Sequence, residues 1–198
     1  MLTDPGAVAD FAPLAERALS VDADAMIRFR SGAGTVGGFV RLPFEVLAGR
    51  TIEAVAGPGD LTVSARDFLS WLDDPSRPPP SRDAHWLSAL PPRAGWQRIE
   101  LVPDSAIREV IRAGAQLAQG TASRAGQQSL LEAIVLTAQS ATRRVEVPLG
   151  PLSALTRMGF LPRDSQAGID TVPGWLRIAA PLGSTFVATG NPLGLLSL

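Results

Sequence analysis

Residues 25–56 read AMIRFRSGAGTVGGFVRLPFEVLAGRTIEAVA, and this stretch decides the fold class. The side chains of its first strand alternate between two faces: Met26, Arg28 and Arg30 on one, Ile27 and Phe29 on the other. Residues 39–56 predict one or two further strands, with Pro43 at an edge, a bulge or a break. Because the connections are short, we expect these strands to pair as an antiparallel meander.

The glycine-rich residues 32–38, GAGTVGG, resemble a phosphate-binding loop in composition but not in context. A dinucleotide fingerprint needs a helix directly after its glycines, whereas the residues that follow here are strand-like. The stretch therefore predicts a hairpin loop.

Helices are predicted on both sides of the meander. Upstream, Asp4 is a candidate N-cap and Pro5 a first helical residue for an amphipathic helix over about 5–19. Downstream, Ser64 and Asp67 have the spacing of a capping box, and the helix they begin should end before Pro75.

A proline-rich stretch, DDPSRPPPSRD at residues 73–83, divides the chain. Its prolines can neither continue a helix nor donate to a sheet, so an extended polyproline conformation is expected. We predict an N-terminal α+β lobe over 1–75, a linker over 76–83 and a C-terminal α+β lobe over 84–198. A single mixed domain is the alternative.

The C-terminal lobe is predicted to be rich in helices and to end in a β-hairpin. The expected order is a strand over 96–102, helices over 105–119 and 127–139, a strand over 143–147, a helix over 150–158 and a strand pair around Gly183. The helix over 127–139 is apolar nearly all round, which indicates burial on several sides. We therefore place Leu130, Ile134 and Leu155 in the core of this lobe.

This element order resembles part of a winged-helix domain. The resemblance covers about 70 residues and rests on the helix that ends in MGFL at 158–161, followed by the strand pair. It implies a nucleic-acid face formed by Arg143, Arg144, Arg157 and Arg163. Many winged-helix-like units bind protein instead, so both kinds of partner stay open.

The composition of the 198 residues excludes several chemistries. Without cysteine there is no disulfide, thiolate metal site or cysteine nucleophile, and the single histidine, His85, excludes a histidine metal site within one chain. All 18 basic residues are Arg, so there is no Schiff-base or Walker lysine. We expect no metal, no cofactor and no catalytic residue. Loss of Lys and Tyr is typical of a high-GC bacterial genome.

A small guanidinium cluster is the main ligand-site candidate of the N-terminal lobe. Arg28 and Arg30 share a strand face, and Arg41 joins them if the strand register allows it. Three guanidinium groups on one face suit a carboxylate or a phosphate, so we predict an anion site there. The alternative is a solvated face paired with nearby acids.

Low charge and high hydropathy point to self-association. Charged residues make up 19% of the chain, mean hydropathy is +0.15, and the tail GNPLGLLSL at 190–198 is apolar. No leader or membrane span is visible, so a cytoplasmic protein is expected. The sequence favours an intracellular protein-interaction or homo-oligomeric module and leans away from an enzyme. The alternatives are a nucleic-acid-binding regulator and, second, a small anionic-ligand binder or enzyme on the Arg-bearing sheet.

Overall fold

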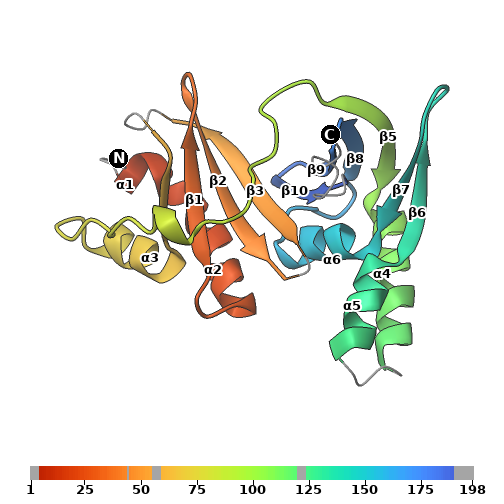
Figure 1. Ribbon diagram of the computed structural model, residues 1–198, viewed down its shortest axis with the longest axis horizontal. Helices are drawn as coiled ribbons and strands as arrows, with labels where there is room; N and C mark the ends of the chain where they lie inside the picture. Colours follow the sequence, from red (N-terminus) through yellow and green to blue (C-terminus); the bar gives the residue numbers. More distant parts are fainter. Residues whose placement is uncertain (1–4, 44, 55–58, 120–123, 190–198) are drawn as a thin grey trace, which may run out of the picture. The chain divides into compact units, whose positions relative to one another are not determined.

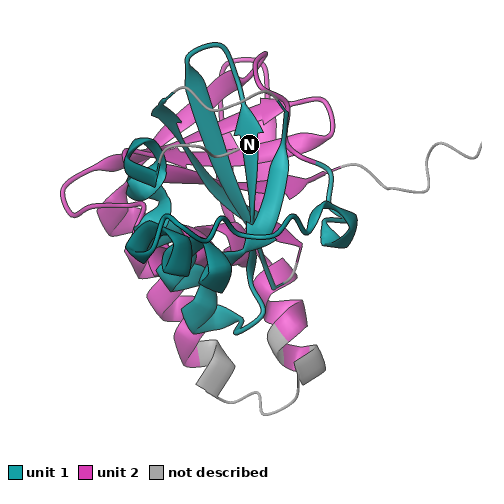
Figure 2. Cartoon of the chain, turned by 90° about the vertical axis from the view of Figure 1, so that its left-hand side faces the viewer, with its two compact units in different colours: residues 1–43, 47–89 teal, residues 44–46, 90–198 magenta. Residues whose placement is uncertain are grey.

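The computed structural model describes residues 5–43, 45–54, 59–119 and 124–189. The chain forms two compact units, coloured separately in Figure 2. Unit 1 comprises Met1–Pro43 and Leu47–Ala89, and unit 2 comprises Phe44–Val46 and Leu90–Leu198. The lobe boundaries at 75 and 84 stay a prediction. The apolar tail lies outside the described residues.

Unit 1 packs helices against an antiparallel sheet, and Figure 1 labels α1, α2, α3, β1, β2 and β3. Its helical elements are α1 (Pro5–Val8), the 3-10 helix η1 (Ala9–Phe11), α2 (Ala12–Val21), α3 (Ala65–Asp73) and the 3-10 helix η2 (Asp83–His85). Its strands are β1 (Met26–Ser31), β2 (Thr35–Leu42), β3 (Val46–Glu53) and β4 (Leu61–Ser64), in the order β4-β1-β2-β3. The predicted meander with a helix before and after it is therefore present.

Alternation along the strands of unit 1 places a set of buried apolar side chains on one face of the sheet. Ile27 pairs with Val40 on β2 and Val63 on β4, and all three are fully buried. Beside them the Phe29 ring lies 5.3 Å from Phe11 and 5.1 Å from Phe68, measured between ring centroids. The Ser64 Oγ accepts the Asp67 N–H and begins α3, as the capping-box spacing predicted.

The predicted glycine loop is present but shorter than 32–38. A turn closes where the Gly32 N–H donates to the Thr35 carbonyl, and Gly34 takes a φ of 72°, which favours glycine. Gly38 instead belongs to β2, where a Cβ atom would lie 2.6 Å from the Phe11 ring. Close packing of that ring, rather than a turn, requires glycine there.

The described residues of unit 2 form two antiparallel sheets and three helices. Its elements are β5 (Gln97–Pro103), α4 (Asp104–Gln119), α5 (Arg124–Glu132), β6 (Ile134–Gln139), β7 (Arg144–Pro148), α6 (Leu149–Arg157), β8 (Gln166–Val172), β9 (Trp175–Ala180) and β10 (Gly183–Ala188). The larger sheet has the order β10-β9-β8-β5, and β6 pairs with β7 alone. A buried hydrogen bond from Thr185 Oγ1 to the Pro151 carbonyl ties β10 to α6.

The predicted helix over 127–139 is wrong in its second half. α5 ends at Glu132, and residues 134–139 form β6. Ile134 is 50% exposed and therefore does not belong to the core, whereas Leu155 is fully buried as expected. Leu130 is half-buried.

The expected winged-helix order is also wrong. It required a buried helix before the strand over 143–147 and a strand pair directly after the next helix. The structure has β6 in place of the second half of that helix and adds β8 before the β9–β10 hairpin. The fold is a mixed α and β architecture dominated by antiparallel pairing. No helix in the described ranges is long and apolar enough to cross a membrane.

Candidate functional site

The β6–β7 hairpin and the β8–β9 turn of unit 2 enclose a surface depression. The hairpin closes at a two-residue turn, where the Ser140 N–H donates to the Arg143 carbonyl at 2.8 Å. The depression has a volume of about 580 Å³. Its lining comes from both sides and from the end of β10: Thr142, Arg143, Arg144, Val145, Glu146, Thr171, Val172, Trp175 and Thr189.

Three groups give the depression its chemistry. Arg143 and Arg144 are exposed, and neither forms an ion pair with a carboxylate of the described residues. Trp175 supplies a half-buried indole, which can pack against an apolar or planar group. The Thr171 Oγ1 is buried and has no hydrogen-bond partner in the part of the chain described, which is uncommon for a buried polar atom. The depression therefore offers positive charge and an aromatic surface, whereas the Thr171 hydroxyl is not accessible from it.

The four arginines predicted for a nucleic-acid face do not all meet there. Arg143 and Arg144 line the depression, whereas Arg157 ends α6 and Arg163 lies in the loop before β8. Both of the latter are exposed and lie outside the depression lining. Trp175 and Thr171 were missed by sequence reasoning, because no motif marks the β8–β9 turn as part of a site.

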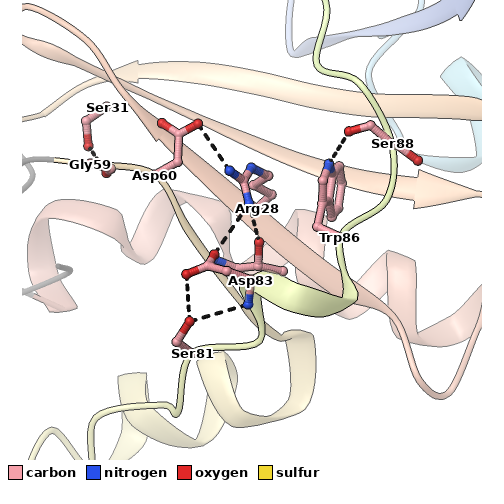
Figure 3. A network of polar contacts seen from close by, with 9 residues as sticks. Arg28, Ser31, Gly59, Asp60, Ser81, Asp83, Trp86 and Ser88 are labelled. Atoms are coloured by element: carbon pink, nitrogen blue, oxygen red, sulfur yellow. Dashed lines mark hydrogen bonds and ion pairs between the residues drawn. The ribbon is translucent and has the colours of Figure 1, made fainter.

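Arg28, the central member of the predicted anion cluster, is held by a polar network within unit 1 (Figure 3). Its Nη1 donates to Thr62 Oγ1 at 2.8 Å and lies 3.4 Å from Asp83 Oδ1. Its Nη2 lies 3.4 Å from Asp60 Oδ2. The chain's own carboxylates thus supply anions for this guanidinium.

The same network fastens the η2 turn to the outer side of β4. The Thr62 N–H donates to Asp83 Oδ1 and the Arg82 N–H donates to the Thr62 carbonyl, each at 2.7 Å. Burial raises the pKa of Asp83, but hydrogen bonds from Ser81 and Thr62 and the charge of Arg28 outweigh it, so the pKa lies below its ordinary value. The sequence did not reveal this role of Asp83.

Arg30 and Arg41 lie on the same sheet face as Arg28. In the β1–β2 register Arg28 is opposite Phe39 and Ile27 opposite Val40, which puts Arg41 beside Met26 on that face. The Arg30 guanidinium lies over the Phe39 ring, 4.8 Å from its centroid. The strand register therefore allows Arg41 to share a face with Arg28 and Arg30. Anion binding by the three arginines stays a prediction.

A second carboxylate network lies in unit 2 and involves no predicted site residue. Asp170 on β8 is 1% exposed and accepts from Arg98 on β5 and from Arg177 on β9, the latter at 2.9 Å. The Arg177 guanidinium also lies 4.5 Å from the Trp96 ring centroid. Two cations compensate one buried carboxylate, so the network joins strands rather than providing a reactive group. Within the described residues no group of three or more His, Asp or Glu side chains is placed to hold a metal ion.

Comparison with known proteins identifies two family models along the chain. Residues 91–192 match the model described as Domain of unknown function (DUF8185), and residues 1–88 match Domain of unknown function (DUF8010). No curated protein sequence matches the chain.

Solved structures of sliding clamps share the fold. The chain is similar to the DNA polymerase sliding clamp from Bacillus subtilis, with a TM-score of 0.62 and 14% identity over 95% of this chain and 65% of that one. It is also similar to the beta subunit of DNA polymerase from Streptococcus pyogenes, with a TM-score of 0.60 and 12% identity over 91% of this chain and 63% of that one. The chain thus spans less than two thirds of the length of these clamp proteins.

Proposed function

The chain belongs to the DUF8185 family through residues 91–192, and from that premise we propose that it is a self-associating protein-interaction module built on the sliding-clamp fold. The observation that carries the proposal is the outer edge of β5. This strand is the last in the order β10-β9-β8-β5, and no other described strand of unit 2 pairs with it. An open strand edge pairs readily with a second chain.

Two terminal strands, β4 in unit 1 and β5 in unit 2, differ in how their edges are protected. At β4 the η2 turn satisfies both the N–H and the carbonyl of Thr62. At β5 no described backbone group outside the larger sheet bonds to the backbone of Gln97–Pro103. Strand β6 lies beside β5, where its Gln139 N–H donates to the Glu100 side chain, and Leu101 on β5 is 51% exposed. An exposed apolar side chain on a strand whose outer backbone groups have no described partner favours association with a second copy.

Charge distribution supports contact between unlike lobes of two copies. Residues 1–75 carry 6 Arg and 11 acidic residues, for a net charge of −5, and residues 84–198 carry 10 Arg and 7 acidic residues, for a net charge of +3. Opposite charges steer the acidic lobe of one copy towards the basic lobe of another.

The helices favour a protein partner over DNA. Duplex binding relies on a concentrated set of Lys and Arg that neutralises phosphates. The described helices α1 to α6 carry six arginines and six acidic residues, so they present no excess of positive charge. The similar structures are those of a DNA polymerase subunit and a DNA polymerase sliding clamp, so DNA stays the second candidate partner for this chain.

Substitution of Leu101 tests the proposal. We expect the wild-type protein to sediment at a multiple of its 20.8 kDa chain mass. Leu101→Glu should raise the dissociation constant at least about tenfold and move the mass towards one chain, because it places a charge in an apolar contact. Leu182→Glu is the matched control, since Leu182 is 49% exposed in the β9–β10 turn.

Two results would contradict the proposal. One is a mass of one chain at every concentration of the wild-type protein. The other is an equal loss of mass in the Leu101→Glu and Leu182→Glu variants, which would remove β5 from the interface.

A further inference from the structure

We propose that the outer edge of β7 binds an extended acidic peptide segment of a partner protein, which adds a third strand to the β6–β7 pair and places side chains in the adjoining depression. This interaction goes beyond self-association and uses a different strand.

The backbone of β7 has an open outer side. Among the described strands, β7 pairs only with β6, with Gln139 opposite Arg144 and Thr137 opposite Glu146. The bond from the Ser140 N–H to the Arg143 carbonyl sets the alternation, so the peptide groups of Arg144 and Glu146 point away from β6. The Gln139 N–H agrees with this alternation, because it points outward from β6 and donates to Glu100 Oε2 at 2.8 Å.

The depression lies along this strand. Five consecutive residues, 142–146, form one of its sides, and Thr171, Val172 and Trp175 contribute to the lining from the β8–β9 turn. A peptide paired with β7 directs alternate side chains to one face, where Val172 and Trp175 offer an apolar surface.

The positive charge beside the depression favours an acidic peptide as the ligand. The guanidinium groups of Arg28, Arg98, Arg108 and Arg177 are each paired with carboxylates of this chain. Arg143 and Arg144 have no such ion pair among the described residues, and the exposed Glu146 is the one acidic residue in the depression lining. Two guanidinium groups at one end of an open strand suit carboxylates of a ligand.

A peptide fits this edge better than a nucleic acid. The outward N–H and C=O groups of Arg144 and Glu146 need a partner that offers acceptors and donors in alternation, which a peptide backbone does. A phosphate backbone offers acceptors alone, so it cannot donate to the outward carbonyl groups of β7. The site therefore favours an acidic strand over a phosphodiester chain.

The test uses a fluorescein-labelled short peptide in which Asp alternates with Val, titrated with the full chain and followed by anisotropy. Three comparison probes are the same peptide with Asn for Asp, the Asp peptide with alternate backbone nitrogens methylated, and a labelled DNA duplex. We expect the Asp peptide to bind more tightly than all three. Arg144→Glu should weaken its binding about tenfold or more, whereas Arg163→Glu, on an exposed loop outside the depression, should leave it unchanged.

Chemical shifts of the wild-type protein, measured during the same titration, locate the binding site without any substitution. Saturable shifts at Arg144, Glu146 and the Trp175 indole support the proposal. It is overturned if the Asp peptide does not bind at millimolar protein, if the methylated peptide binds equally well, or if DNA binds more tightly through Arg144. Because none of these measurements depends on Leu101, failure here is distinguishable from failure of self-association.

Discussion

Asp83 is the residue that connects the proline-rich segment to the sheet of unit 1. Its carboxylate accepts the N–H of Thr62, a residue with no exposed surface, and the Oγ–H of Ser81, and it lies near the Arg28 guanidinium. The Thr62 amide would otherwise be a buried donor on an edge strand. Satisfying it protects β4 from pairing with other chains.

Asp83→Ala should lower the free energy of unfolding by about 1–2 kcal/mol, because it leaves the buried Thr62 N–H without its acceptor. Asp83→Asn is the matched control, since its amide oxygen can still accept that hydrogen bond. Urea unfolding of both variants checks this. Equal losses in the two variants would show that the charge of Asp83, rather than its role as an acceptor, stabilises β4.

The stability contributed by ionised Asp83 should depend on pH. Its pKa in the folded protein lies below the ordinary value, so this contribution is complete above the unfolded-state pKa of about 3.9 and is lost as pH falls through the folded-state pKa. The difference in unfolding free energy between wild type and Asp83→Asn should therefore be constant near neutral pH and shrink below about pH 4. A difference that grows as the pH is lowered would contradict the assignment.

The sequence predicted which side chains share a strand face, but it did not predict which residues those side chains contact. Alternation along β1 placed Arg28 and Arg30 together, and the register then brought Arg41 to the same face. The partners of Arg28 lie 32, 34 and 55 residues away, at Asp60, Thr62 and Asp83. Only folding brings such distant residues together. Neither the polar network around Arg28 nor the attachment of the η2 turn to β4 could therefore be predicted from the sequence.

At the scale of elements, residues 130–139 show where periodicity fails. The run LLEAIVLTAQ is apolar enough for a buried helix, yet the helix ends at Glu132 and a strand follows. Short apolar runs fit helix and strand equally well, and the β-branched pair Ile134 and Val135 favours a strand. The pairing of β6 with β7 decides the outcome, because it supplies the backbone partners.

Two alanine substitutions distinguish the observed fold from the predicted helix. Ile134→Ala should change the free energy of unfolding by less than about 1 kcal/mol, since half of the side chain is already exposed. Leu155→Ala on α6, which is fully buried, should cost about 2–5 kcal/mol. Thermal unfolding of both variants provides the measurement. A loss at Ile134 as large as that at Leu155 would restore Ile134 to the core.

Strand β8 was not expected, and its sequence explains why. Gly168 and Asp170 interrupt its apolar residues, and both residue types are uncommon in strands. In the folded chain Asp170 is compensated by Arg98 and Arg177 from the two neighbouring strands. A strand whose central charge depends on partners from β5 and β9 cannot be found from its own residues.

At the scale of the whole molecule, composition and pattern predicted a mixed α and β protein with an antiparallel meander, but not the clamp fold. The similar clamp structures share 12–14% of their residues with this chain, so no motif carries the likeness. Such a fold is maintained by the alternation and burial of apolar side chains, which many sequences satisfy. Its strand order depends on pairing between segments that are distant in the sequence. The winged-helix prediction used only the order of elements along the chain, which does not contain that information.

Hydrogen exchange as a function of protein concentration tests the central claim, self-association through β5, most directly. Among the described residues, the N–H groups within 97–103 that point away from β8 have no backbone partner, and they should exchange more slowly once a second copy pairs with them. Residues 61–64, whose edge is covered by Asp83, should exchange at the same rate at all concentrations. We expect protection of 97–103 to rise with concentration in the wild type and not in Leu101→Glu; exchange of 97–103 that is independent of concentration, in a protein that sediments as a single chain, would contradict the account.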